Sequence, residues 1–399
     1  MTRLWDKGEK GTALDGRVLE YTAGDDHALD DRLVAYDIRA SIAHAEMLAE
    51  KDLLSPTDLS SIRTALNAIG AEHAAGQWRV TLEQEDGQTA IENLLTARIG
   101  ATGGRLHAGR SRNDQVLAAL RLYLRDAAAA LESGALQVAR ALDAIASRQG
   151  SVELPGYTHM QQAMPSSVGL WAGGFAAELR DDAEGLAATQ RRIGKNPLGS
   201  AAGFGTPNLE VSRESTRRRL EFTAIHEPVT AVQLSRGKAE AQLLFEATLL
   251  AQDLGRLAAD LLLFYTQEFA FVSLPDAFTT GSSIMPQKRN ADVFELMRGR
   301  SAVAQAALTE VLGITQKLTS GYHRDLQLIK PPLFRGIDST LQTLEILPGA
   351  LDGVQFRPEN IHLDPSIHAA AAANALVATE GIPFRDAYRR VAEKLKDKK

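Results

Sequence analysis

The most constraining feature of this sequence is a set of long stretches with helical composition. Residues 114–149 contain no proline and a single glycine, and they are rich in Ala, Leu and Arg, which favour helix. At a rise of 1.5 Å per residue this stretch predicts a helix of roughly 50 Å. Similar stretches occupy 164–192, 233–268 and about 291–318. Because strand signals are sparse, we expect an all-α fold built as a long-helix bundle.

The stretch 233–268 is apolar around much of its helical circumference, with Leu and Phe side chains recurring from Leu243 to Phe264. A helix that is apolar on most faces is buried on most faces. One chain has few ways to surround several such helices, so the pattern predicts a homo-oligomer whose subunits bury the helices together. A monomeric bundle is the alternative.

Glycine- and proline-rich segments separate the long stretches and are loops by composition: 100–112, 150–165, 194–213 and 273–290. A shorter helical region lies at about 30–70, and a region with frequent Pro and Gly begins at about 348. The sequence therefore predicts three domains: an N-terminal helical domain (1–107), a central long-helix bundle with the polar loops (108–347) and a short C-terminal helical domain (348–399).

Composition narrows the class of function. The 399 residues carry a net charge of -6, which argues against nucleic acid and for a small-molecule substrate. The absence of cysteine excludes disulfides, thiol nucleophiles and Cys-bound metals. We expect no membrane span, because no apolar run of about 18 residues occurs, and a cytoplasmic location, because the polar start 1–7 does not resemble a signal peptide. Neither a metal-ligand spacing, a Gly-rich dinucleotide motif nor a P-loop is present, so no metal and no cofactor is expected.

The first polar segment that suits chemistry is His107-Ala-Gly-Arg-Ser-Arg-Asn-Asp-Gln115, directly before a long helix. Asn113 stands where a helix N-cap is expected, and helix N-termini favour anions. Arg110 and Arg112 can each hold a carboxylate through two hydrogen bonds. The alternative is that Asn113 is only a cap and that the arginines are solvated.

The second segment is Gly156-Tyr-Thr-His-Met-Gln-Gln162, which lies between two prolines. His159 has hydroxyl and amide neighbours, and such a histidine can transfer protons near neutral pH. A lone loop histidine is more often structural or exposed, and that is the alternative.

The third and fourth segments are Thr280-Gly-Ser-Ser-Ile-Met-Pro-Gln-Lys-Arg-Asn290 and Tyr322-His-Arg-Asp-Leu-Gln-Leu-Ile-Lys330. In the third, a serine pair is followed by Lys288 and Arg289. Cations and loop amides of this kind stabilise a developing alkoxide. The hydroxyl, amide and ammonium groups of the fourth can converge on a polar substrate. For both segments the alternative is a polar surface loop.

Together these segments resemble the fumarase/aspartase superfamily of lyases, and within it the argininosuccinate lyases, which include the delta-crystallins. The Gly-Ser-Ser-Ile-Met-Pro-Gln-Lys-x-Asn loop is similar to the signature of the superfamily. The Gly-Arg-Ser-Arg-Asn-Asp-Gln, Gly-Tyr-Thr-His and Tyr-x-x-Asp-x-Gln-x-x-Lys patterns are similar to the argininosuccinate branch. The resemblance runs from Leu4 to about Val391.

The resemblance implies a homotetramer of mostly helical subunits with active sites built from three chains. The implied reaction is an anti β-elimination that releases fumarate and arginine from argininosuccinate. Ser282 is implied as the base that removes the Cβ proton, and Lys288 with the loop amides as the stabiliser of the resulting aci-carboxylate. His159, oriented by Glu295, is implied as the partner in proton transfer. The division of acid and base roles between Ser282 and His159 stays open.

The resemblance also implies the residues that bind substrate. Asn113, Thr158 and Asn290 would bind its carboxylates, Tyr322, Gln327 and Lys330 would hold its other polar parts, and Arg110 and Ser111 belong to the same binding set.

The sequence departs from the family pattern at several positions. Gln88 replaces a common His, Ala108 a Thr and Ala291 a Pro. The segment Thr22-Ala-Gly-Asp-Asp26, which should grip the arginine end, does not align with the usual serine. The chain stops soon after Tyr388, where relatives continue for some tens of residues, so we expect a short C-terminal domain.

Two other functions compete with this one. A lyase of the same fold can act on another fumarate adduct, such as adenylosuccinate. A non-enzymatic crystallin-like protein is the second alternative, although it has no need of Ser282, His159, Lys288 and Asn290.

Overall fold

The structure of this chain is a computed structural model that describes residues 15–396. The polar start 1–7, and the beginning of the family resemblance at Leu4, lie outside the described residues. The described chain forms two compact units. Unit 1 comprises 15–132, 185–248 and 303–339, and unit 2 comprises 133–184, 249–302 and 340–396.

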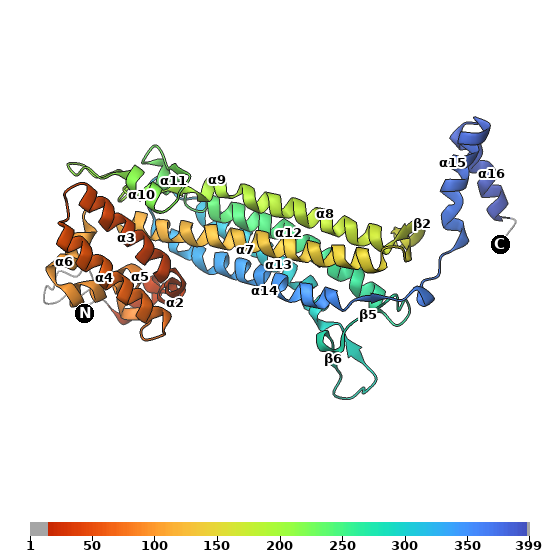
Figure 1. The fold of residues 1–399 in the computed structure, drawn as a ribbon, viewed down its shortest axis with the longest axis horizontal. Coiled ribbons are helices and arrows are strands. Elements are labelled where there is room, and N and C mark those ends of the chain that lie inside the picture. Colours follow the sequence, from red (N-terminus) through yellow and green to blue (C-terminus); the bar gives the residue numbers. More distant parts are fainter. Residues whose placement is uncertain (1–14, 397–399) are drawn as a thin grey trace. The chain divides into compact units, whose positions relative to one another are not determined.

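The long helices are the main elements of both units (Figure 1). They are α7 (Arg112–Gln149), α8 (Val168–Ala188), α12 (Lys238–Tyr265), α13 (Asp292–Thr315) and α14 (Lys330–Asp352). Each begins in one unit and ends in the other. The predicted long-helix architecture is confirmed. The predicted division into three consecutive domains differs from these discontinuous units and stays a prediction.

The N-terminal part of unit 1 is a cluster of shorter helices: α1 (Gly16–Ala23), α2 (Asp26–Asp30), η1 (Asp31–Leu33), α3 (Val34–Glu50), α4 (Pro56–Ala74), η2 (Leu82–Gln84), α5 (Gly87–Ile99), α6 (Ala101–Gly104) and η3 (Arg105–His107). Buried side chains such as Leu48, Leu66 and Leu95 join α3, α4 and α5 in one core. The Ser55 hydroxyl accepts from the Asp58 amide at the start of α4, and the Asp86 carboxylate accepts from the Thr89 amide at the start of α5. These caps fix where both helices begin.

The rest of unit 1 is made of short elements that connect the long helices: α9 (Gln190–Ile193), β3 (Lys195–Asn196), α10 (Arg213–Arg219), β4 (Ala224–Ile225), α11 (Ala231–Leu234) and η5 (Arg324–Ile329). Strands β3 and β4 pair in parallel. Close packing of the long helices here depends on Gly336 of α14, where a Cβ atom would lie 2.6 Å from Leu244 Cδ2 and 3.0 Å from Ala307 Cβ.

Unit 2 contains a β-hairpin where the sequence predicted a loop and the start of a helix. Strand β1 (Glu153–Thr158) pairs antiparallel with β2 (Gln161–Ser167), with Pro155 opposite Pro165. The loop prediction for 150–165 is therefore wrong over most of that segment, and the helix predicted from 164 begins only at Val168.

The remaining elements of unit 2 are β5 (Val272–Ser273), η4 (Asp276–Phe278), β6 (Thr280–Gly281), β7 (Arg289–Asn290), β8 (Gln355–Phe356), η6 (Pro358–Asn360), η7 (Pro365–His368), α15 (Ala369–Glu380) and α16 (Phe384–Lys396). Strands β5 and β8 pair antiparallel, as do β6 and β7. The Trp171 ring contacts Phe264 and Phe356, with centroids 5.9 and 5.3 Å away, and these rings form an aromatic cluster in unit 2.

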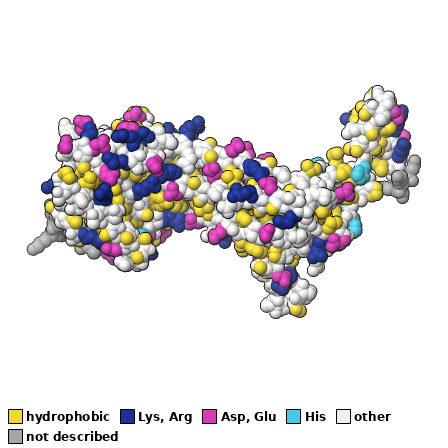
Figure 2. Space-filling model, in the orientation of Figure 1, with side chains coloured by type: hydrophobic (Ala, Val, Ile, Leu, Met, Phe, Trp, Pro, Cys, Tyr) yellow, Lys and Arg dark blue, Asp and Glu magenta, His cyan; other side chains and the backbone are white. Residues whose placement is uncertain are grey.

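Hydrophobic side chains also lie on the surface of the long helices. On the visible face they are interspersed with charged side chains (Figure 2). The exposed fraction is 70% for Leu170, 62% for Leu296 and 47% for Phe245. Within residues 15–396, no helix combines the length and the apolar character needed to cross a membrane.

Candidate active site

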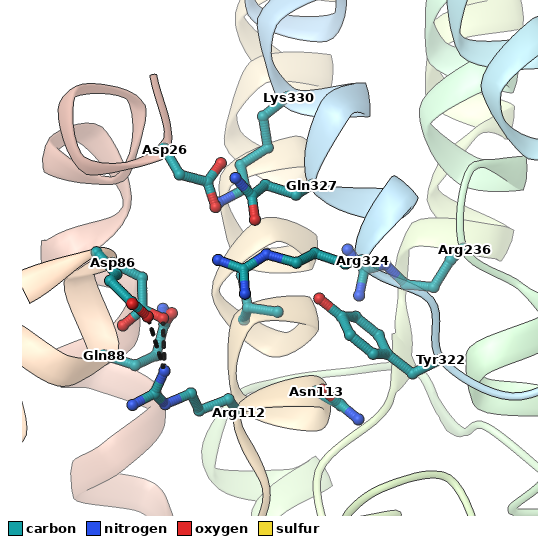
Figure 3. Close-up of a pocket in the computed structure, with 12 residues that line it drawn as sticks. Asp26, Asp86, Gln88, Arg112, Asn113, Arg236, Tyr322, Arg324, Gln327 and Lys330 are labelled. Carbon is teal, nitrogen blue, oxygen red and sulfur yellow. Dashed lines mark hydrogen bonds and ion pairs between the residues drawn. The ribbon is translucent and has the colours of Figure 1, made fainter. Parts of the chain in front are cut away.

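A polar cavity of about 220 Å³ lies within unit 1, beside the N-terminus of α7 (Figure 3). Its lining combines acidic, basic, amide and phenol side chains. The lining residues are Asp26, Glu85, Asp86, Gln88, Arg112, Asn113, Val116, Arg236, Tyr322, Arg324, Gln327 and Lys330. Three carboxylates and four cations therefore face one small volume, which suits a ligand that carries both signs of charge.

The first turn of α7 forms one wall of the cavity and contributes Arg112, Asn113 and Val116. Ser111, rather than Asn113, caps this helix: its hydroxyl accepts from the Asn113 amide at 3.3 Å. The Asp114 carboxylate in turn accepts from the Ser111 amide at 2.9 Å. The prediction that Asn113 is the N-cap is therefore wrong by two positions, because a serine hydroxyl nearer the helix start makes that bond. The Asn113 side chain is left to line the cavity.

Asp114 connects the start of α7 to the loop that follows β3. Its Oδ2 atom accepts from the amides of Gly199 and Ala201 at 2.9 and 2.8 Å. The side chain is fully buried, and burial raises the pKa of Asp114 to about 6 although these amides favour the charged form. The loop is held against the helix that carries Asn113.

Lys330, the first residue of α14, lies buried between two carboxylates of α2. Its Nζ atom is 2.6 Å from Asp30 Oδ1 and 2.9 Å from Asp26 Oδ2. Burial acts to lower the pKa of Lys330, but Asp30 and Asp26 outweigh it and the pKa is raised. Burial also raises the pKa of Asp26 to about 7, against the opposing effect of Lys330. The ammonium ion is therefore held in the charged form.

The segment 322–330 also lines the cavity, through Tyr322, Arg324, Gln327 and Lys330. The Gln327 amide donates to the carbonyls of Thr22 and Ala23 at 3.0 and 2.9 Å, and Arg324 donates to the Thr22 carbonyl. The guanidinium carbon of Arg236 lies 5.9 Å from the centre of the Tyr322 ring. The segment that aligned poorly with the family, 22–26, thus lies at the cavity and provides Asp26.

Arg112 meets the acidic side of the cavity. Its Nη1 atom is 3.1 Å from Asp86 Oδ2, the pair joined by dashed lines in Figure 3. Burial raises the pKa of Asp86, and Arg112 opposes that shift. Arg324 points from its own segment toward this pair.

Arg110 does not line the cavity. It is buried, and its Nη1 atom donates to the Ser41 hydroxyl at 2.8 Å. That hydroxyl donates to Asp37, which also accepts from the amides of Gln88 and Gln115. Arg110 therefore belongs to a buried network behind the cavity wall, and the Gln88 that departs from the family pattern connects this network to the cavity.

His159 lies in unit 2, at the tip of the β1–β2 hairpin. The two residues between the strands, His159 and Met160, have φ of 53° and 60°. Two positive φ values in a two-residue loop define a type I′ turn, a conformation that side chains other than Gly, Asn and Asp rarely adopt. The neighbouring Thr158 ends strand β1, and both His159 and Thr158 are exposed. A strained, exposed histidine is typical of a functional position.

Ser282 lies in unit 2, in the loop that joins β6 and β7. Its Oγ atom accepts from the backbone amides of Met285 and Ile284 at 3.2 and 3.4 Å. Amide donors aimed at a hydroxyl oxygen stabilise negative charge on it. Lys288 is exposed on the same loop, and the Asn290 amide faces the Thr280 hydroxyl at 3.5 Å.

Glu295 is exposed on the first turn of α13. Among the described residues, no hydrogen bond or ion pair joins His159 to Glu295 or to Ser282. The structure thus gathers Asn113, Tyr322, Gln327 and Lys330 around one cavity in unit 1. Arg110 and Ser111 also belong to unit 1 but do not line this cavity. The remaining predicted residues lie in unit 2: Thr158, His159, Ser282, Lys288, Asn290 and Glu295.

Several lining residues were missing from the predicted binding set: Asp26, Glu85, Asp86, Arg112, Arg236 and Arg324. Arg112 lies in the 107–115 segment and Arg324 in the 322–330 segment. Both segments were recognised, so their place in the sequence indicated that these two arginines could line the site. Asp26 ends the 22–26 segment that was associated with the arginine end, although no residue of that segment was named. Arg236 belongs to no recognised segment, and only the fold brings it to the cavity.

Comparison with known proteins identifies the family and the fold of this chain. A family profile described as "Lyase" matches residues 19–306. An argininosuccinate lyase from Sorangium cellulosum is 48% identical over 98% of this chain and 90% of its own length. Among solved structures, EDDS lyase in complex with formate has a TM-score of 0.80 at 23% identity, covering 96% of this chain and 76% of its own. A class II fumarase from Schistosoma mansoni has a TM-score of 0.77 at 17% identity, covering 96% and 88%. The all-α, long-helix fold is confirmed, and the chain belongs to the lyase family, within it to the argininosuccinate lyases.

Proposed function

We propose that this protein is a carbon–nitrogen lyase that cleaves argininosuccinate into fumarate and L-arginine, as a step of arginine biosynthesis. The observation that carries the proposal is the unit 1 cavity, where Asp26, Glu85 and Asp86 face four cations beside Asn113. Argininosuccinate carries several carboxylates together with an ammonium and a guanidinium group. A cavity with both signs of charge matches that distribution, because each group can be paired as it leaves water.

The elimination removes a proton from one carbon of the new double bond and the guanidino nitrogen from the other. A base removes the Cβ proton of the succinyl part, and the C–H electrons form the double bond of fumarate. The C–N bond breaks with its electrons going to the guanidino nitrogen, which takes a proton from an acid. We assign Ser282 as the base, because two backbone amides surround its Oγ atom.

Charge builds on the substrate carboxylate next to Cβ as this proton leaves. Lys288, on the same loop as Ser282, would stabilise the resulting aci-carboxylate. Removing one donor of that kind typically costs about 3–4 kcal/mol in the activation free energy. Asn113, Thr158 and Asn290 would bind the carboxylates, and Tyr322, Gln327 and Lys330 the other polar groups.

His159 would partner Ser282 in proton transfer, with Glu295 as its orienting carboxylate. We propose that these unit 2 residues meet the cavity of other copies of the chain, in a homotetramer with shared active sites. The support within the chain is the exposed apolar surface of the long helices, including Leu170, Leu296 and Phe245. Exposed side chains of this size on central helices are typical of an oligomer interface.

The reaction is tested by following absorbance of released fumarate when the purified protein is mixed with argininosuccinate, with adenylosuccinate as the comparison substrate. Ser282→Ala should lower kcat by several orders of magnitude while substrate still binds. The matched control is Ser283→Ala, which removes the neighbouring hydroxyl and should stay within a few-fold of the wild type. A kcat for Ser282→Ala within about tenfold of the wild type, or ~1.4 kcal/mol, would contradict the assignment.

The assembly is tested by light scattering. We expect a solution mass near four times the 43.0 kDa of one chain. Full turnover by a species with the mass of one chain would show that the active site is complete within a single copy.

A further inference from the structure

A second cavity in unit 1, with a volume of about 330 Å³, has a lining that is rich in cations. We call it the Arg121 cavity. It is lined by Arg121, Arg192, Lys195, His226, Ala231, Leu234, Ser235, Lys238 and Ala239. Four cationic residues and a histidine thus line this cavity, and no carboxylate belongs to its lining. None of these residues lines the cavity of the candidate active site.

Two buried side chains with unpartnered nitrogen atoms lie in the lining. Arg121 is 1% exposed and His226 is 8% exposed. The Arg121 guanidinium donates to the Arg192 carbonyl and to the Ser235 hydroxyl. Its Nε atom has no hydrogen-bond partner, and neither has His226 Nδ1. A buried donor such as Arg121 Nε is costly to leave without a partner, so a bound acceptor would relieve it.

The other cations lie nearer to solvent. Arg192 and Lys238 are exposed, and Lys195 is half-buried. Within residues 15–396, none of the cationic side chains of the lining forms an ion pair with a carboxylate. Burial lowers the pKa of His226 to about 4, and Arg121, Lys195, Arg213 and Lys238 add to that shift. The neighbouring cations thus act in the same direction as burial and disfavour a proton on His226.

Glu240, which is fully buried on α12, favours the charged form of Arg121 and does not belong to the lining of the cavity. Neither oxygen of Glu240 has a hydrogen-bond partner. A single carboxylate does not balance Arg121, Arg192, Lys195 and Lys238, so the cavity keeps an excess of positive charge.

We propose that the Arg121 cavity binds a small oxyanion that carries two negative charges. Inorganic phosphate and a dicarboxylate such as fumarate share this chemistry. The cavity has room for such an ion with water, since one water occupies about 30 Å³. Arginine side chains bind oxyanions through paired hydrogen bonds, and lysines add point charge at the mouth.

The site is tested by calorimetric titration of the full-length protein with inorganic phosphate, and separately with fumarate, at constant ionic strength set by chloride. The wild type should show saturable binding of at least one ion, and the tighter ion identifies the natural source. Arg192→Gln should weaken that binding at least threefold, and Arg192→Gln with Lys238→Gln at least tenfold. Both positions are exposed, and melting curves confirm that the variants fold.

Arg191→Gln is the matched control, because it removes the same charge from the neighbouring exposed position, which does not line the cavity. Its affinity should equal that of the wild type. The proposal is overturned if the wild type binds neither ion saturably, if the double variant binds as tightly as the wild type, or if Arg191→Gln weakens binding as much as Arg192→Gln. Fumarate is also the product of the proposed reaction and can bind at the candidate active site. Only binding that Arg192→Gln weakens and Arg191→Gln leaves unchanged is therefore assigned to the Arg121 cavity, and the phosphate titration does not depend on the proposed reaction.

Discussion

Lys330 is a buried cation whose ammonium group contacts two carboxylates. Asp30 also accepts from the Gly87 amide at 3.0 Å, so it joins α2 to α5 as well as to α14. Because a buried ion pair rarely stabilises a fold more than apolar side chains of similar size would, the presence of this group is better explained by the cavity it lines.

Replacing Lys330 with methionine should leave Asp26 and Asp30 buried without their counter-ion. We expect the free energy of unfolding to fall by about 3–5 kcal/mol, as measured by urea denaturation. Adding Asp30→Asn should recover part of this loss, because the amide oxygen can still accept from Gly87. Equal stability of Lys330→Met and the wild type would show that the carboxylates are not held by this cation.

Residue motifs located four lining residues of the cavity, Asn113, Tyr322, Gln327 and Lys330, because each lies in a short segment with a recognisable pattern. The 22–26 segment was recognised as the one that should bind the arginine end, but Asp26 itself was not identified, because its role depends on Lys330, which is 304 positions away. Arg110 shows the opposite limit. Its motif indicated a binding role, but the fold directs the guanidinium to Ser41.

At the level of elements, helix contacts within unit 1 depend on small residues. Gly336 on α14 faces Leu244 of α12 and Ala307 of α13 at distances that leave no room for a methyl group. Protein interiors are close-packed, so an added carbon atom must displace its neighbours.

Gly336→Ala should therefore lower the free energy of unfolding by about 1–3 kcal/mol through overpacking. Gly313→Ala on α13 is the matched control, because a Cβ atom there meets nothing within 4 Å. Its stability should rise by about 0.5–1 kcal/mol, since alanine favours helix over glycine. Thermal unfolding of the two variants in parallel measures both effects, and a stabilised Gly336→Ala would refute the packing explanation.

The long helices were predictable because a proline-free run of strong helix formers has few other structures open to it. The β1–β2 hairpin was not. Its strands contain Pro155, Gly156 and Pro165, which are poor strand formers. A two-stranded ribbon tolerates such prolines because each strand has an edge that needs no hydrogen bonds. The amino-acid composition of the segment does not show that its strands will have such a free edge.

At the scale of the whole molecule, buried titratable groups set how stability responds to acid. Burial lowers the pKa of His44 to about 3, and Arg110 adds to the shift. Burial and nearby cations lower the pKa of His226 to about 4. Both rings are neutral in the folded state, whereas in the unfolded chain they take up a proton near pH 6.5. Their contribution to stability is present above pH 6.5 and is lost as the pH falls toward these lower values.

We expect His44 to account for a loss of about 2–3 kcal/mol in the free energy of unfolding between pH 7 and pH 4.5. Urea denaturation at both pH values should show a smaller loss for His44→Gln, which keeps a donor for the Ala108 carbonyl but cannot titrate. The comparison with the variant is needed because Asp26 and Asp114, whose pKa values are raised, act in the opposite direction. Identical pH dependence in the two proteins would exclude His44 as a source.

The fold and the reaction class followed from patterns that a single chain contains, and the complete site did not. Asn113 and Lys330 lie in unit 1, while His159 and Ser282 lie in unit 2. Sequence motifs identify these residues as one set because each motif is recognised along the chain, without reference to its position in space. The sequence holds no physical signal for whether one chain or several copies bring them into contact.

The bond between Asp114 and the loop after β3 has a consequence for the exchange of amide hydrogens with solvent. The amides of Gly199 and Ala201 belong to an irregular segment, where exchange is ordinarily fast, yet both donate to one buried carboxylate. Their exchange then requires opening of the first turn of α7 rather than local motion of the loop. Slow exchange of these two loop amides would therefore show that the helix end carrying Asn113 is ordered. The measurement needs no bound ligand.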